Sequence, residues 1–217
     1  MRRIMRLAAL LALGGLVGSW FLRQVWWFRD PLRTAPRGRG YLSPLDGRVI
    51  AIERIEGGMV RSGPYAELIG ASPQTGLPAP SEGWRVVVSQ SPLDVHYLYA
   101  PSAGTVELAE QEPPRQRSLR LNFWPGRHRP GPGDHRWGIR FAGASLGSTV
   151  VTVSSADHRA MDWRVVSGET VRIGQKVAVA MSPISAELYL PAAASVLVAV
   201  GDRLLGGQTL LAETATS

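Results

Sequence analysis

The stretch Gly168–Val177, GETVRIGQKV, decides the fold because it recurs at Gly201–Leu210 as GDRLLGGQTL. Both copies open with a glycine and an acidic residue, and both carry a Gly-Gln pair six residues after the first glycine. A second echo joins SPLDGRV at 43–49 to APSAGTV at 100–106. Units this short and this few do not make a solenoid. They predict one β domain built from quasi-symmetric halves.

Short runs of β-branched and aliphatic residues fill the rest of the chain, separated by Gly, Pro, Asp and Ser. This pattern is typical of an all-β barrel or sandwich. The turns in which glycine and an acidic residue precede a strand are similar to those of barrel-sandwich hybrids, as in biotinyl and lipoyl carrier domains. Residues 70–83 and 125–133 are predicted loops. The predicted strands are 48–55, 84–89, 105–109, 119–123, 137–141, 149–154, 163–166, 176–180, 186–190 and 195–200.

The composition points to an anionic partner. The chain of 217 residues has 24 Lys and Arg against 17 Asp and Glu, a formal charge of +7, and only one lysine, Lys176. It contains no cysteine, which excludes disulfides and thiolate metal sites. Basic proteins bind nucleic acid or anionic membranes, and no nucleic-acid-binding motif is present. A phospholipid membrane is therefore the expected partner.

The N-terminus carries an apolar segment that fits this partner. Arg2, Arg3 and Arg6 precede an uncharged run at 7–22, which as a helix spans roughly 24 Å of a hydrocarbon core of about 30 Å. Aromatic residues at 20–28 extend it as an interfacial belt. A cleaved signal peptide is disfavoured because no A-x-A-like site follows. We expect a membrane anchor at 1–28 and a β domain at 29–217, on the cytoplasmic side of the cell membrane.

Four motifs follow in a fixed order: FRDP at 28–31, SPLDG at 43–47, SPLDVH at 91–96 and YLP at 189–191. Together they resemble the compact bacterial and archaeal type of phosphatidylserine decarboxylase. The resemblance covers most of 25–110 and 163–213. It implies an enzyme that converts phosphatidylserine to phosphatidylethanolamine and CO2. It also implies a pyruvoyl group that the chain makes by breaking its own backbone at a serine.

The resemblance further implies an Asp–His–Ser triad for self-cleavage, here Asp46, His96 and Ser185. Serine is a weak nucleophile at neutral pH, so an imidazole must take its proton and a carboxylate must orient that imidazole. The resulting pyruvoyl carbonyl acts as an electron sink for the loss of CO2. Each residue also has a purely structural interpretation. Asp46 precedes a glycine and is typical of a turn, and His96 is consistent with a histidine that hydrogen-bonds to backbone within a strand.

The processing position departs from the family pattern. Members of the family have Gly-Ser seven residues before the proline that ends the YLP-like strand, whereas the seventh residue before Pro191 is Ile184, preceded by Pro183. Ser185 is adjacent, and a one-residue shift in a strand turns a side chain to the opposite face. Ser185 is therefore expected to require a bulge. Members of the family also have a segment with the sequence ENER, of which this chain retains only the arginine, Arg136. A non-catalytic member that binds lipid or a partner is the alternative.

The remaining motifs are weaker. LGST at 146–149 matches the processing site of longer decarboxylases but lies far upstream of YLP. GASLG at 143–147 fits a nucleophile elbow only if a helix follows, and the sequence there predicts a strand. His128 and His135 lack metal-site spacing, so no metal is expected. A membrane-tethered biotinyl-like adaptor is a further alternative. The chain is a possible homo-oligomer, and arginines expected near lipid headgroups are Arg29, Arg33, Arg37 and Arg39.

Overall fold

The computed structural model describes residues 2–21, 25, 29–36, 40–60, 77, 80–111, 130, 134–143, 146–157 and 161–214. The chain divides into one unit at Met1–Leu32 and a second at Arg33–Ser217. The first unit contains the only helix of the described residues, and the second contains every described strand. The protein is therefore mainly β behind an N-terminal helix, as the sequence predicts.

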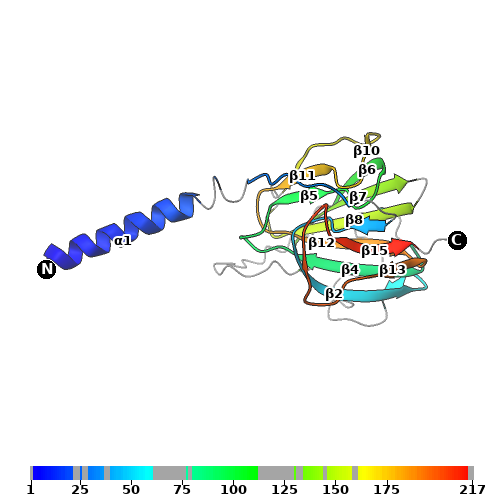
Figure 1. Cartoon of the computed structure of the whole chain (residues 1–217), viewed down its shortest axis with the longest axis horizontal. Coiled ribbons are helices and arrows are strands. Elements are labelled where there is room, and N and C mark those ends of the chain that lie inside the picture. The colour runs from blue at the N-terminus through cyan, green and yellow to red at the C-terminus, as the bar shows by residue number, and fades with distance from the viewer. Residues whose placement is uncertain are drawn as a thin grey trace. The chain divides into compact units, whose positions relative to one another are not determined.

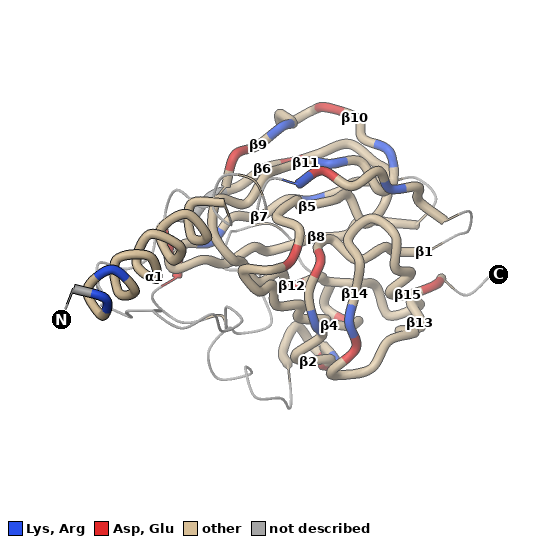
Figure 2. The backbone as a smooth tube through the Cα atoms, turned by 60° about the vertical axis from the view of Figure 1, so that its left-hand side comes forward, with Lys and Arg blue, Asp and Glu red and all other residues tan. Residues whose placement is uncertain are grey.

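Helix α1 runs from Arg2 to Phe21. Its basic residues gather at its N-terminal end, as Figure 2 shows, and the rest of the helix is uncharged. The segment Arg3–Phe21 is long and apolar enough to cross a membrane, judged by its length and composition. A signal sequence has the same properties near a chain start, so this helix is only weak support for an anchor.

The second unit holds three sheets. The large sheet has the strand order β10-β6-β7-β8-β12-β4-β2-β14, with β3 paired to β2, and two smaller sheets have the orders β1-β15-β13 and β5-β11-β9. Figure 1 shows the long strands of the large sheet side by side. The strands are β1 Gly40–Leu42, β2 Gly47–Glu56, β3 Met59–Val60, β4 Gly83–Ser89, β5 Tyr97–Tyr99, β6 Gly104–Gln111, β7 His135–Gly143, β8 Gly147–Ser155, β9 Met161–Trp163, β10 Thr170–Val171, β11 Lys176–Ala180, β12 Ser185–Pro191, β13 Ala194–Val196, β14 Arg203–Leu204 and β15 Leu210–Thr214.

Most of the predicted runs are strands. The runs at 48–55, 84–89, 105–109, 137–141, 149–154, 176–180 and 186–190 lie within β2, β4, β6, β7, β8, β11 and β12. The runs at 163–166 and 195–200 only overlap the short strands β9 and β13, and 119–123 lies outside the described residues. The large sheet runs from β10 to β14 without closing on itself in the described residues. Its barrel form therefore remains a prediction.

The two sequence echoes form two equivalent sets of hydrogen bonds. Gly174 N–H donates to the carbonyl of Ala100 at 2.9 Å, and its equivalent Gly207 N–H donates to Ser43 at 2.8 Å. Both glycines have positive φ, +74° and +69°, a conformation that favours glycine. The bond from Val106 N–H to Glu169 recurs as Val49 N–H to Asp202, and β10 pairs with β6 as β14 pairs with β2. The two halves thus repeat one local structure.

One face of the large sheet packs into the main apolar core, and the other combines buried polar side chains with a small hydrophobic cluster. Side chains of β12 alternate, so Ala186, Leu188 and Leu190 enter the main core while Glu187 and Tyr189 point the other way. Both faces of β12 are buried. We call the second side the polar face. The register of neighbouring strands places the following polar residues on it: Glu53, Arg85, Ser89, Arg136, Thr152, Ser154, Ser185, Glu187 and Tyr189.

Gly207 offers a direct test of the repeat geometry. A Cβ at this position would lie 2.8 Å from a ring atom of Tyr99, whereas Gly57, with φ +59°, has open space around it. Gly57→Ala is expected to lower the free energy of unfolding by roughly 1–2 kcal/mol, the strain of a left-handed residue. Gly207→Ala adds about 1–3 kcal/mol of overpacking. Chemical denaturation of both variants measures the difference, and equal losses would contradict this close contact.

Candidate active site

The segment that carries His96 begins with a tight turn. The Asp94 carboxylate accepts hydrogen bonds from the N–H and the hydroxyl of Ser91, both at 2.8 Å, and Asp94 N–H donates back to the Ser91 carbonyl at 3.0 Å. Asp94 therefore caps the turn that delivers the chain to His96. The His96 side chain is completely buried.

A ring of hydrogen bonds links this segment to the peptide before Ser185. Gln90 donates from its side chain to the Val95 carbonyl at 2.8 Å and from its backbone N–H to the Ile184 carbonyl at 3.0 Å. The His96 carbonyl accepts from Ala180 N–H at 2.7 Å. The backbone from Ala180 to Ile184 connects these two hydrogen bonds and closes the ring. The backbone of His96 and the Ile184–Ser185 peptide therefore belong to one hydrogen-bonded unit.

Ser185 is the first residue of β12 and is completely buried. It pairs in register with Ser89 of β4 and Ser154 of β8, and the register from 185 to 191 continues unshifted along β4. No bulge interrupts this described strand. Ile184 lies in the main core, so Ser185 is on the opposite, polar face. Ile184, seven residues before Pro191, is thus a core residue, and the bulge expected for Ser185 is absent from this strand.

Asp46 lies just before β2, and its carboxylate accepts three hydrogen bonds, two from Arg33 and one from Gly206. Arg33 pairs with both carboxylate oxygens, with Nη2 2.8 Å from Oδ2, and Gly206 N–H donates to Oδ1 at 2.7 Å. Arg33 also donates to the Gly206 carbonyl at 2.7 Å and lies over the Tyr99 ring, 5.1 Å from its centroid. These are the contacts described for the Asp46 carboxylate. A contact between Asp46 and His96 stays a prediction.

The arginines expected near lipid headgroups differ in their surroundings. The Arg33 side chain is only 7% exposed and pairs with Asp46, and its contact with lipid headgroups stays a prediction. Arg29 is half-buried in the first unit. Arg37 and Arg39 lie outside the described residues.

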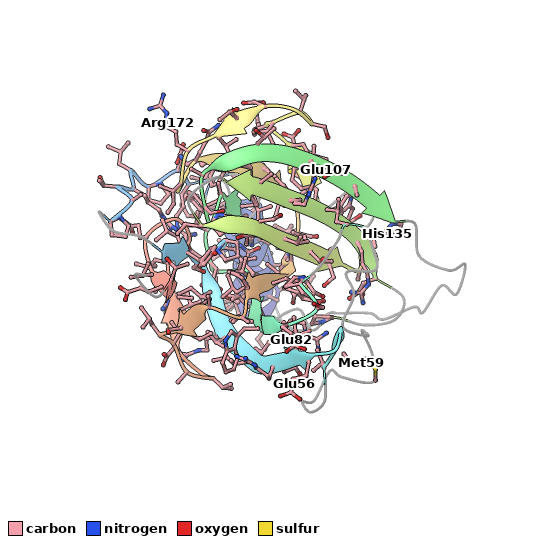
Figure 3. All side chains as sticks on the ribbon, turned by 90° about the vertical axis from the view of Figure 1, so that its right-hand side faces the viewer. Glu56, Met59, Glu82, Glu107, His135 and Arg172 are labelled. Carbon is pink, nitrogen blue, oxygen red and sulfur yellow. The ribbon has the colours of Figure 1, made fainter. Side chains whose placement is uncertain are left out.

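An ionic network on the polar face was missed from the sequence. Arg85 donates to Glu53 at 2.6 Å and lies 3.9 Å from Glu187, which also accepts from the Tyr189 hydroxyl at 2.8 Å. Arg136 reaches the other oxygen of Glu187 at 3.4 Å. Figure 3 shows strands β6, β7 and β8 of the large sheet, with Glu107 on β6 and His135 at the start of β7. Two buried arginines and two buried glutamates thus lie on the same face of the sheet as Ser185.

Burial is the largest cause of the pKa shifts of the two acidic members of this network, Glu187 and Tyr189. It raises the pKa of Glu187 above its ordinary value of 4.5, although the Arg85 and Arg136 charges and the Tyr189 hydroxyl oppose the shift. Burial also raises the pKa of Tyr189 well above its ordinary value, and the Glu187 charge adds to this shift. Glu187 is therefore harder to ionise in the folded chain than in the unfolded chain.

This shift predicts a pH dependence of stability. A carboxyl group with a raised folded pKa favours folding below its unfolded pKa, and that contribution is lost as pH rises through the folded pKa. The stability of the wild type relative to Glu187→Gln is therefore expected to fall as pH rises above about 4.5. Urea titrations from pH 4 upward measure this. A relative stability that rises over the same range would contradict the burial argument.

Two motifs set aside in the sequence occupy ordinary structural positions. Gly147, within LGST, has φ +77° and begins β8 at the hairpin where Gly143 pairs with Gly147. Strand β8, not a helix, follows GASLG, so the requirement for a nucleophile elbow is not met. His128 lies outside the described residues, and His135 stacks on Trp137 with ring centroids 6.0 Å apart.

Fold and site together define a mainly β protein in which hydrogen bonds link the backbone at a buried histidine to the peptide that precedes a buried serine. The sequence profile of the phosphatidylserine decarboxylase family matches residues 20–125. A protein of Saccharopolyspora erythraea named phosphatidylserine decarboxylase proenzyme is 31% identical, over 94% of this chain and 77% of its own length. The chain belongs to the phosphatidylserine decarboxylase family.

Two further relatives carry the same name. The protein of Novosphingobium aromaticivorans is 27% identical over 98% of this chain and 84% of its own length. The protein of Symbiobacterium thermophilum is 27% identical over 92% of this chain and 83% of its own length.

Proposed function

We propose that the protein is a membrane-associated phosphatidylserine decarboxylase that converts phosphatidylserine to phosphatidylethanolamine and CO2. The observation that carries the proposal is the hydrogen-bonded ring through Gln90, which ties the His96 segment to the Ile184–Ser185 peptide. Membership of the family supplies the reaction and the substrate. Asp46, His96 and Ser185 are the proposed machinery of self-processing.

The self-processing step can be written with this chain's own atoms. His96 accepts the Ser185 hydroxyl proton, the Ser185 oxygen attacks the Ile184 carbonyl carbon, and the peptide C–N bond breaks to leave an ester and the Ser185 amine. Loss of the Ser185 α-proton then expels Ile184 as a carboxylate. The dehydroalanine left at 185 tautomerises to an imine, and water replaces its nitrogen, which leaves as ammonia. The product is a pyruvoyl group on the new N-terminus.

The position of Ser185 suits such a group. Ser185 is the first residue of β12, and residues 181–184 precede the strand as a loop, so a break at 184–185 leaves the strand whole. The pyruvoyl group would supply an electron sink for loss of CO2. Ser185 would hold it on the buried polar face. Strands β12 to β15 pair with β4, β8, β2 and β1, which would keep the two fragments together.

Membrane association, with the β domain on the cytoplasmic side, is the second part of the proposal. The membrane association draws support from the apolar length of α1 and from the lipid nature of the substrate. Arg29 remains a candidate for contact with anionic headgroups, each such charge contributing about 1 kcal/mol at a surface. We also retain the barrel-sandwich-hybrid likeness, which the repeated hydrogen-bond pattern of the two halves favours.

The proposal is tested by assaying the full chain on vesicles of phosphatidylserine labelled in its carboxyl carbon. Release of labelled CO2 with matching formation of phosphatidylethanolamine is the expected result, and Ser185→Ala is expected to abolish both. A wild-type chain that releases no CO2 would overturn the proposed activity.

A non-catalytic member of the family is the second candidate. The observation that favours it is Ile184, a core residue at the position where the family has its serine, preceded by Pro183. Such a protein would keep the β domain and bind lipid or a partner without processing. It would sediment with phosphatidylserine vesicles and remain a single chain, which separates it from the enzyme.

A further inference from the structure

Gln90 is a buried residue outside the proposed Asp46–His96–Ser185 triad. It directly follows β4, it is completely buried, and it makes two hydrogen bonds in different directions. One goes to the peptide that would break and the other to the residue before His96. Its side-chain Oε1 atom is buried without a hydrogen-bond partner in the described part of the chain. Such an atom costs about 1–3 kcal/mol, so stability alone does not account for glutamine here.

The backbone N–H of Gln90 lies on the reacting carbonyl. It donates to the Ile184 oxygen at 3.0 Å. This is the oxygen that becomes negatively charged when the Ser185 hydroxyl adds to the Ile184 carbonyl carbon. A donor that already points at that oxygen gains strength as charge develops, most of all in a buried site of low dielectric. The β4–β12 ladder holds the donor in place before the reaction begins.

The side chain of Gln90 holds the proposed base. Its Nε2 donates to the Val95 carbonyl at 2.8 Å, one residue before His96. The same residue therefore fixes both the carbonyl under attack and the backbone that carries the imidazole. A displacement of about 1 Å between reacting groups can slow a reaction by about 10²-fold, so this common support matters.

We infer that Gln90 serves self-processing twice, with its backbone N–H as the oxyanion donor and its side chain as a positioning group for His96. This inference rests on the proposed function, because it concerns the same bond. In the step that it assists, the Ser185 oxygen bonds to the Ile184 carbon, the serine proton passes to His96 and the carbonyl electrons move onto the Ile184 oxygen. Collapse of that oxyanion breaks the C–N bond, whose nitrogen takes the proton from His96.

The backbone role is tested by replacing the amide with an ester. The α-hydroxy analogue of glutamine at position 90 removes the N–H and keeps the side chain. Cleavage, followed by intact mass from freshly made chain, is expected to slow by about 10²-fold, the effect of losing one oxyanion donor. The matched control is the same replacement at Val88, which pairs with Ala186. Hydrogen-bonded pairs alternate along the ladder, so this ester removes an equivalent bond away from the reacting carbonyl.

The side-chain role is tested with Gln90→Met, which keeps the length and the backbone N–H but cannot donate to Val95. Cleavage is expected to slow by about 10-fold, with melting temperature recorded in parallel. If wild type cleaves and the esters at 90 and 88 slow it equally, the inference is wrong while the proposed function stands. If wild type never cleaves, the proposed function fails and the inference falls with it.

Discussion

Replacing His96 by alanine is expected to slow self-cleavage by about 10²- to 10⁴-fold, the usual contribution of a positioned general base. The reason is that the Ser185 hydroxyl has to lose its proton as it attacks, and His96 is the proposed base, whose backbone is linked to this peptide by hydrogen bonds. Intact mass measured at intervals after synthesis gives the rate directly. The product to follow is the fragment that begins at Ser185.

The control for this variant is His135→Ala. His135 lies at the start of β7, where it stacks on Trp137, and has no part in the proposed chemistry. It is expected to cleave at the wild-type rate. Because His96 is completely buried, thermal unfolding of His96→Ala must show a folded chain before its rate is interpreted. A folded His96→Ala protein that cleaves as fast as the wild type would remove His96 from the mechanism.

The second large effect concerns Arg33 and Asp46. Arg33→Ala is expected to lower the free energy of unfolding by about 3–5 kcal/mol, because it leaves a buried carboxylate without its counter-charge. Arg33→Lys restores the charge but not the two-pronged contact, so an intermediate loss is expected. Arg164→Ala is the control, since its pair with Asp162 is largely exposed and worth about 0–1 kcal/mol.

A double-mutant cycle sharpens this result. With Asp46→Ala present, Arg33→Ala is expected to be far less harmful, because no unpaired carboxylate remains. Urea denaturation of the four proteins gives the coupling energy. Losses that simply add would show that the two residues act independently, contrary to the contacts in this structure. If Asp46 also supports processing, Arg33→Lys should recover cleavage better than Arg33→Ala.

The sequence predicts the fold well where patterns are local. Long strands such as β2 and β8 are visible as β-branched runs, and the paired glycine turns show the repeat. Strands of two or three residues, such as β10 and β14, were missed because so short a segment carries no periodicity. Their place in the sheet depends on distant partners in the other half of each repeat.

The site was less accessible from the sequence. Motif order supplied Asp46, His96 and Ser185, but the partner of Asp46 is Arg33, in a segment that reads as a basic linker. Polar residues that alternate with apolar ones in β12 read as solvent-facing, whereas Glu187 is completely buried among charges from β2, β4 and β7. Gln90 gave no signal at all, because its two hydrogen bonds join parts of the chain that only the fold brings together.

The most direct test of the account is the intact mass of the purified full chain. Processing at Ser185 predicts two fragments, residues 1–184 and 185–217, with the shorter one blocked at its N-terminus, and it predicts that Ser185→Ala remains whole. A single 23.5 kDa chain in the wild type, or a break at any other residue, would contradict the claim that Ser185 is the point of self-cleavage.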